Sequence, residues 1–215
     1  METLEKVISL DSFREVIQDK PKRVMEKIPV SGDDIFIQLN NTPIYNEDDL
    51  ILTDDDGEVD YESLDKESGL IEFASAPEYG IITAVYYTVQ LSDSVLVSCL
   101  TNALTAHAPG IKWEDFFEEE DTETDNFKEI PFITLLAASS ACFILSSKWA
   151  TKVRVRTDDL TVSEDQVAGR YLELGRWYKD MYKDSSSGMI DVQTLTRRAL
   201  ETGELVPLPE DWYDE

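Results

Sequence analysis

The residues that carry most enzyme chemistry are scarce in this chain, which has one histidine and two cysteines among 215 residues. His107 lies on the apolar side of a predicted helix, near its C-terminal end, a position typical of a structural histidine. Cys99 and Cys142 fall within apolar helical patterns, which predicts buried free thiols rather than a disulfide or metal ligands. No phosphate-binding loop, metal-ligand spacing or nucleophile elbow occurs. We therefore expect a protein that is not an enzyme and that needs no cofactor or metal.

Positive charge is also scarce, because 19 Lys and Arg residues stand against 45 Asp and Glu residues and the net charge is −26 at pH 7. Such a surface repels nucleic-acid phosphate at long range, which argues against a DNA- or RNA-binding module built on basic patches. The same surface suits a channel wall along which DNA slides, since a wall without cationic contacts gains no affinity from counterion release. Charge alone is equally consistent with acidity that only maintains solubility.

Long apolar runs and targeting signals are not expected either. No run approaches the roughly 18 apolar residues of a membrane span, and Met1–Leu4 has neither the basic region nor the apolar core of a signal peptide. We expect synthesis in the cytoplasm and no membrane contact. An apolar fraction of 42% with 10% aromatic residues exceeds that of a disordered acidic chain, so the chain is predicted to fold.

Residues 24–90 are predicted to form a small antiparallel β domain inserted into a helical chain. Short runs rich in β-branched and aromatic residues alternate there with strong turn signals. Leu70–Phe73 and Ile81–Val89 are predicted to pair as a hairpin. Residues 41–80 carry 13 acidic residues against one lysine, so this domain is expected to be a strongly acidic sandwich or barrel-like module.

The rest of the chain is predicted to be helical, which makes the fold class α+β. Residues 1–23 form an expected N-terminal helical segment, and residues 91–183 form the core of a bundle of three to four helices. Helical periodicity indicates helices over residues 92–109, 131–150 and 163–183. The second is apolar on almost all sides, which predicts the central helix of a bundle or a helix shared between subunits.

Two further segments carry aromatic side chains that suit contacts. Residues 111–126 are predicted to be an acidic loop pinned to the body or to a neighbour by its aromatic residues. Residues 184–215 are predicted to be a linker, a short helix and an extended C-terminal arm, because two prolines forbid a helix at its end. The arm packs on the chain's own helices or captures a partner. Its candidate partner-binding residues are Leu205, Val206, Pro207, Leu208, Pro209, Trp212 and Tyr213.

One acidic turn superficially resembles a calcium-binding loop. If Gly57 takes the invariant glycine position of such a loop, Leu52 becomes the first ligand and Ser63 the last, so only Asp54 and Asp56 stay in register. The pattern therefore favours an acidic β-turn, and loose cation binding at Asp54 and Asp56 stays open.

Two stretches resemble the head–tail connector (adaptor, or head completion) proteins of tailed bacteriophages. The first runs from Leu91-Ser92-Asp93 to Ala103–His107, after the strand-like Gly80–Tyr87. The second runs from Leu135–Cys142 through Asp159-Leu160-Thr161-Val162-Ser163 into Tyr171–Leu174. In that family an Ala-rich helix leads through a turn and a Leu-Thr/Ser-Val segment into another amphipathic helix. The resemblance covers roughly residues 80–183 and rests on small apolar residues and their spacing.

The resemblance implies a virion protein at the neck, assembled as a ring, often a dodecamer, beneath the portal protein. DNA would pass through the channel of the ring without specific binding, and a tail or tail-completion (nozzle) protein would follow. The C-terminal arm of the family reaches toward the portal, so the arm residues named above become a portal-docking segment. Two other readings stay open. The chain could be another phage structural protein, such as a tail-completion protein or a fibre-associated β module, or an acidic DNA mimic that occupies DNA-binding proteins.

Overall fold

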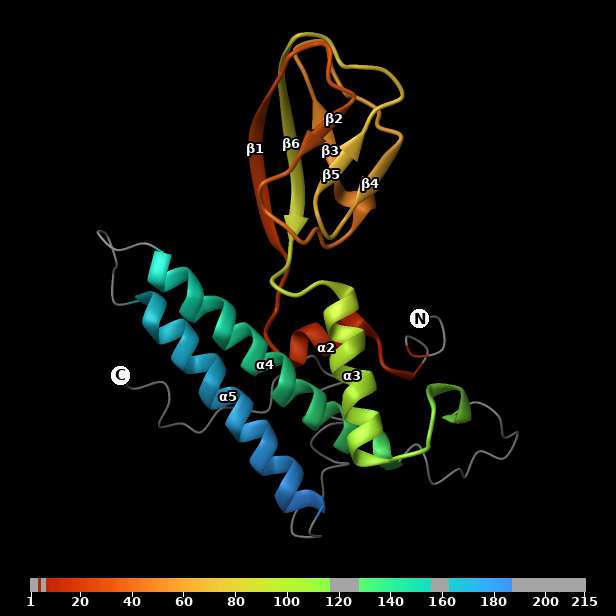
Figure 1. Ribbon diagram of the computed structural model, residues 1–215, viewed down its shortest axis with the longest axis vertical. Helices are drawn as coiled ribbons and strands as arrows, with labels where there is room; N and C mark the ends of the chain where they lie inside the picture. The colour runs from red at the N-terminus through yellow and green to blue at the C-terminus, as the bar shows by residue number, and fades with distance from the viewer. Residues whose placement is uncertain (1–3, 5–6, 117–127, 156–162, 187–215) are drawn as a thin grey trace. The chain divides into compact units, whose positions relative to one another are not determined.

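The computed structural model describes residue 4 and residues 7–116, 128–155 and 163–186. The chain divides into two compact units (Figure 1). Residues 19–92 form one unit, which we call the β unit, and the residues before and after this stretch form the helical unit. The fold is thus α+β, with the β unit inserted into the helical chain, and each unit is described by itself below.

The β unit consists of two antiparallel three-stranded sheets (Figure 1). In the first sheet the strand order is β1-β6-β3, and in the second it is β2-β5-β4. The strands are β1 (Lys22–Val30), β2 (Phe36–Gln38), β3 (Ile51–Thr53), β4 (Ser63–Asp65), β5 (Leu70–Glu72) and β6 (Gly80–Thr88).

Both sheets contribute to one hydrophobic core, which makes the β unit a small sandwich. Ile82, Ala84 and Tyr86 alternate along β6 and are all at most 1% exposed. They share one cluster with Ile37 of β2 and Ile71 of β5 from the other sheet. Because side chains alternate across a strand, this inward set leaves the odd-numbered residues of β6 on the outer face of its sheet.

The predicted hairpin between Leu70–Phe73 and Ile81–Val89 is wrong, because the two strands lie in different sheets. β5 pairs with β2 and β4, whereas β6 pairs with β1 and β3. β6 is nine residues long and pairs with the equally long β1 along its whole length, from Lys22 opposite Thr88 to Val30 opposite Gly80. β1 satisfies the backbone N–H and C=O groups along one whole edge of β6, which the three-residue β5 could not have done.

The boundaries of the β unit also differ from the expectation of 24–90. β1 starts at Lys22, so the end of the predicted helical segment 1–23 belongs to the sheet. Within the described part of that segment, the α-helix α2 covers Leu10–Val16. The unit's own ends are tied together, because the fully buried carboxylate of Asp19 accepts backbone N–H bonds from Gln90 at 2.7 Å and from Leu91 at 3.0 Å.

The helical unit contains α2, α3 (Asp93–His107), α4 (Ile130–Val155) and α5 (Ser163–Ser186). The predicted helices are present, and the second one extends beyond the expected end at residue 150. The predicted loop after α3 holds a short 3-10 helix, Trp113–Phe116, whose two aromatic end residues are buried. The indole N–H of Trp113 donates to Thr101 Oγ1 at 3.3 Å, so this aromatic segment is pinned to α3.

α4 and α5 pack closely along their length (Figure 1). The hydroxyl of Ser139 donates to the carbonyl oxygen of Gly175 at 2.8 Å, and the hydroxyl of Ser146 donates to that of Ala168 at 2.9 Å. A Cβ atom at Gly175 would lie 3.1–3.2 Å from the ring of Phe143 and from the carbonyl oxygen of Ser139. Glycine and serine thus allow the two backbones to approach each other.

α2 is held in the helical unit by polar contacts as well as by its buried Phe13. The guanidinium of Arg14, 3% exposed, forms a 2.5 Å ion pair with Asp93 at the start of α3. The phenol of Tyr178 on α5 donates to the carbonyl oxygen of Val16 at 2.6 Å, which satisfies a carbonyl at the end of α2. Neither contact follows from local sequence pattern, since the partners are far apart in the chain.

Candidate functional site

The predicted portal-docking arm, from Leu205 to Tyr213, lies outside the residues that the structure describes. Among the described residues, the features that could form a functional site are an acidic turn, the contacts of His107, two thiols, the helix α4 and the two outer faces of the β sandwich.

The acidic turn after β3 uses its first carboxylate to hold its own backbone. Asp54 Oδ1 accepts the N–H groups of Asp56 at 2.8 Å and Gly57 at 2.9 Å, and the N–H of Asp54 donates to the carbonyl oxygen of Gly57. Gly57 has φ 141°, a conformation that favours glycine. Among the described residues no group of three or more His, Cys, Asp or Glu side chains is placed to hold a metal ion. The predicted acidic β-turn is confirmed, and nothing supports a cation at Asp54 and Asp56.

His107 connects three parts of the helical unit. Its Nε2 lies 2.5 Å from a carboxylate oxygen of Glu129, which precedes α4, and its Nδ1 lies 3.0 Å from the hydroxyl of Tyr182 on α5. Its ring also stacks on that of Phe132, with centroids 5.2 Å apart. A neutral ring with the proton on Nε2 donates to Glu129 and accepts from Tyr182, so both nitrogens are engaged. This geometry supports a structural tie between helix ends.

The two thiols are buried and free, as the apolar helical patterns predict. Burial raises the pKa of Cys142 to about 12, and the nearby Cys99 adds to the rise. Burial also raises the pKa of Cys99. Both side chains therefore stay protonated at neutral pH, and since the thiolate is the reactive form, they are poor nucleophiles.

The composition of α4 is unusually apolar. By length and composition, Ile130–Ala150 could cross a membrane, with mean hydropathy 1.8, and half of this stretch is buried inside the protein. The expectation that no segment approaches a span is therefore wrong as a statement about composition, although a core helix has the same composition. Phe143 is half-buried and its ring lies beside Gly175 of α5, whereas Ile144 is 36% exposed. α4 thus keeps a small apolar surface at Ile144.

None of the outward residues on the three strands of sheet β1-β6-β3 is acidic, and the exposed Glu58, bridged to Thr53 of β3, adds a carboxylate only at the β3 edge of this face. Strand register places Met25, Val85 and Ile51 in one row across its three strands. Met25 is 64% exposed and Ile51 48% exposed, and Ile81 further along β6 is 53% exposed. Two exposed cations, Arg23 and Lys27, flank this apolar row on β1. The ten outward residues are Arg23, Met25, Lys27, Pro29, Ile51, Thr53, Ile81, Thr83, Val85 and Tyr87.

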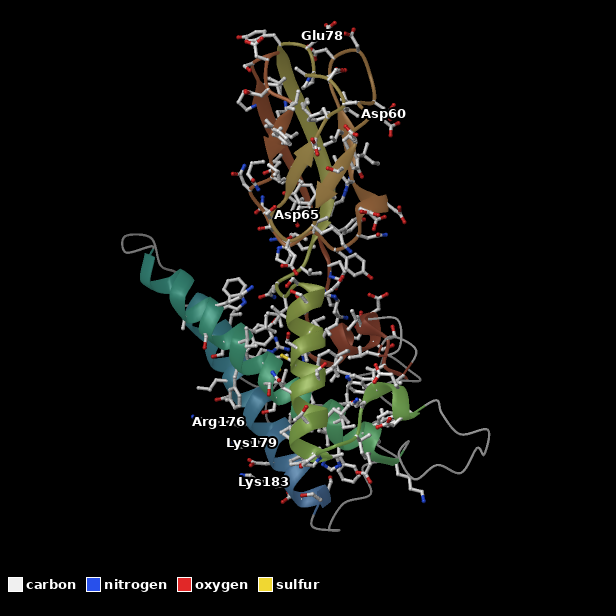
Figure 2. All side chains as sticks on the ribbon, turned by 45° about the vertical axis from the view of Figure 1, so that its right-hand side comes forward. Asp60, Asp65, Glu78, Arg176, Lys179 and Lys183 are labelled. Atoms are coloured by element: carbon white, nitrogen blue, oxygen red, sulfur yellow. The ribbon has the colours of Figure 1, made fainter. Side chains whose placement is uncertain are left out.

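The outer face of sheet β2-β5-β4 has a similar apolar centre with the opposite charge. Phe36 is 46% exposed and Leu70 40% exposed. Glu72 lies opposite Phe36 in the ladder, and Asp65 lies opposite Leu70. Figure 2 labels Asp65 together with Asp60, which is also exposed. Because the inner faces of both sheets share one core, the two outer faces lie on opposite sides of the sandwich.

A second group of exposed cations lies on α5. Arg176, Lys179 and Lys183 follow one another along this helix at spacings of three and four residues (Figure 2). Lys183 lies 3.4 Å from Asp180 on the same helix, an exposed pair that contributes little to stability. These cations lie in the helical unit and so form a separate feature from Arg23 and Lys27.

No protein-family model and no curated protein matches this chain. The sequence did not predict the two charged faces of the sandwich. It also did not predict the bonds from Gln90 and Leu91 to Asp19 that tie the ends of the β unit together. The alternation of Arg23, Met25 and Lys27 is visible in the sequence, but it identifies an exposed face only when β6 is known to be the neighbour.

Proposed function

We propose that this chain is a virion structural protein that forms an adaptor ring between the portal and the tail of a tailed bacteriophage. The ring would continue the DNA channel, and the acidic surface would let DNA pass without binding. The resemblance over residues 80–183 is the reason for proposing an adaptor, and the composition of α4 and the net charge support this role physically.

The observation that carries the proposal is the apolar composition of α4. Half of its most apolar stretch is buried inside the protein and Ile144 within it is 36% exposed, and burying apolar area stabilises an assembly at roughly 25 cal/mol per Å². In a ring, neighbouring copies would cover this surface. Homo-oligomers with closed symmetry are the common way in which a single chain satisfies such a surface.

The proposed adaptor also uses the net charge of −26. A lumen lined with carboxylates gives no counterion release on contact with DNA, so DNA would slide rather than stick. The expected result is no retention of double-stranded DNA in a mobility-shift assay, even at low salt. Retention at low salt that is lost as salt rises would contradict a non-sticking channel.

The main experiment is assembly of the purified chain with a cognate portal protein, followed by mass photometry and electron microscopy. We expect rings, either alone or on the portal. Truncation after Gly203 removes Leu205–Tyr213 and should abolish portal binding while leaving the fold of both units intact. A strictly monomeric protein that ignores portal would refute the proposal, and a monomer that binds basic DNA-binding enzymes instead would favour the DNA-mimic reading.

A further inference from the structure

The two outer faces of the β sandwich are complementary to each other. One face has an apolar centre flanked by Arg23 and Lys27, and the opposite face has an apolar centre flanked by Asp65 and Glu72. Since they lie on opposite sides of one sandwich, they cannot meet within a single copy. A second copy of the chain brings them together.

We propose that the β units of neighbouring copies stack head to tail, with the outer face of sheet β1-β6-β3 of one copy against the outer face of sheet β2-β5-β4 of the next. This inference deepens the proposed ring by naming a contact between its protomers, and so it rests on the proposed function. A contact between two different faces is heterologous, and repetition of such a contact closes into a ring when its rotation allows closure.

Charge favours the contact between these two outer faces over other contacts between two copies. The β unit has 17 acidic and five basic residues, so most contacts between two copies place carboxylate against carboxylate. Four of the five bases lie between Lys20 and Lys27, and Arg23 and Lys27 point to the outer face of sheet β1-β6-β3, where the carboxylate of Glu58 lies at the opposite, β3 edge. That face is therefore the one at which a second acidic β unit is attracted.

The apolar residues supply the other half of the fit. Met25, Ile51 and Ile81 are each about half exposed or more on one face, and Phe36 and Leu70 are exposed on the other. Polar and charged margins around an apolar centre are the usual anatomy of a protein–protein interface. Placing the two centres together removes apolar area from water, and the flanking charges then pair at the rim.

Charge-reversal variants of the full chain test the pairing. R23E/K27E makes the first face acidic, and S63K/E72K makes the second face basic; all four positions are exposed or half-buried on outer faces. Each variant alone should weaken self-association at least about 100-fold, as measured by sedimentation velocity at low salt. The matched control R176E/K179E makes the same charge change on α5 as R23E/K27E makes on β1 and should leave association unchanged. Circular dichroism and thermal unfolding of each variant check the fold.

Recombining the reversed faces gives the decisive result. An equimolar mixture of R23E/K27E and S63K/E72K should assemble, because each reversed face then meets a face of opposite charge. The quadruple variant should assemble by itself for the same reason. If R23E/K27E loses association but neither the mixture nor the quadruple variant restores it, the basic face contacts another surface of the neighbouring copy and this pairing is wrong.

The outcomes separate this inference from the proposed function. If all variants form rings as the unaltered chain does, the ring stands and the stacking of β units is wrong. If the unaltered chain stays monomeric at high concentration and on portal, both are wrong. If single-face variants lose rings and the swapped pair regains them, both are supported.

Discussion

Two glycine-to-alanine substitutions in α5 measure how closely α4 and α5 approach each other. At Gly169 an added Cβ meets nothing within 4 Å, whereas at Gly175 it lies 3.1–3.2 Å from ring carbons of Phe143 and 3.2 Å from the carbonyl oxygen of Ser139. Both sites gain about 1 kcal/mol from the higher helix propensity of alanine. Only Gly175→Ala also incurs overpacking, which costs about 1–3 kcal/mol.

We therefore expect Gly169→Ala to raise the free energy of unfolding by about 1 kcal/mol, and Gly175→Ala to lower it by up to about 2 kcal/mol. The difference between the two variants, about 1–3 kcal/mol, is the direct measure of the close approach. Urea unfolding followed by far-UV circular dichroism reports on the helical unit, with the slope of the transition checked for constancy. Equal stabilisation by both substitutions would refute the tight α4–α5 contact at Gly175.

Three further predictions concern single side chains. Asp19→Ala should destabilise the β unit by about 3 kcal/mol, because two backbone N–H bonds to a charged acceptor are lost. Urea unfolding followed by tyrosine fluorescence measures this change. A loss below about 1 kcal/mol would show that the bonds of Asp19 to Gln90 and Leu91 do not hold the ends of the unit. A chromogenic thiol reagent at neutral pH should leave Cys99 and Cys142 unmodified in the native protein and modify both after denaturation, since burial raises the pKa of both thiols; rapid native modification would show exposed thiols. Burial, with a smaller contribution from Glu26, raises the pKa of Tyr86 from 10.0 to about 12. The stabilisation from this shift is complete below pH 10 and is lost as pH rises toward 12, on the order of 2 kcal/mol; Tyr86→Phe should flatten this part of the pH profile of unfolding, and an unchanged profile would contradict the assignment.

Much of the helical unit could be predicted from the sequence. Helical periodicity places α3, α4 and α5 within a few residues of their observed bounds, because the spacing of apolar residues along a helix is a local property. The burial of Cys99 and Cys142 follows from the same spacing. The partners of His107 do not, since Glu129 and Tyr182 come from other segments of the chain.

The β unit shows where local pattern stops being informative. Its strands and its acidic turn at Asp54–Gly57 are visible in composition, yet the hairpin assigned to β5 and β6 is wrong. A strand carries the same alternation of side chains whichever strand lies beside it, so sequence alone leaves the neighbour undecided. In the folded protein, the equal lengths of β1 and β6 and the core shared by the two sheets determine which strands are neighbours.

Composition and short-range periodicity are enough to predict the α+β class, the acidity, the scarcity of catalytic residue types and the positions of the three long helices. They do not predict which strands pair, which side of each sheet is exposed or which helix faces are covered. Those features depend on contacts between residues far apart in the chain. The outer face of sheet β1-β6-β3, basic along β1 and apolar at its centre, is such a feature, since it exists only once β1, β3 and β6 lie side by side.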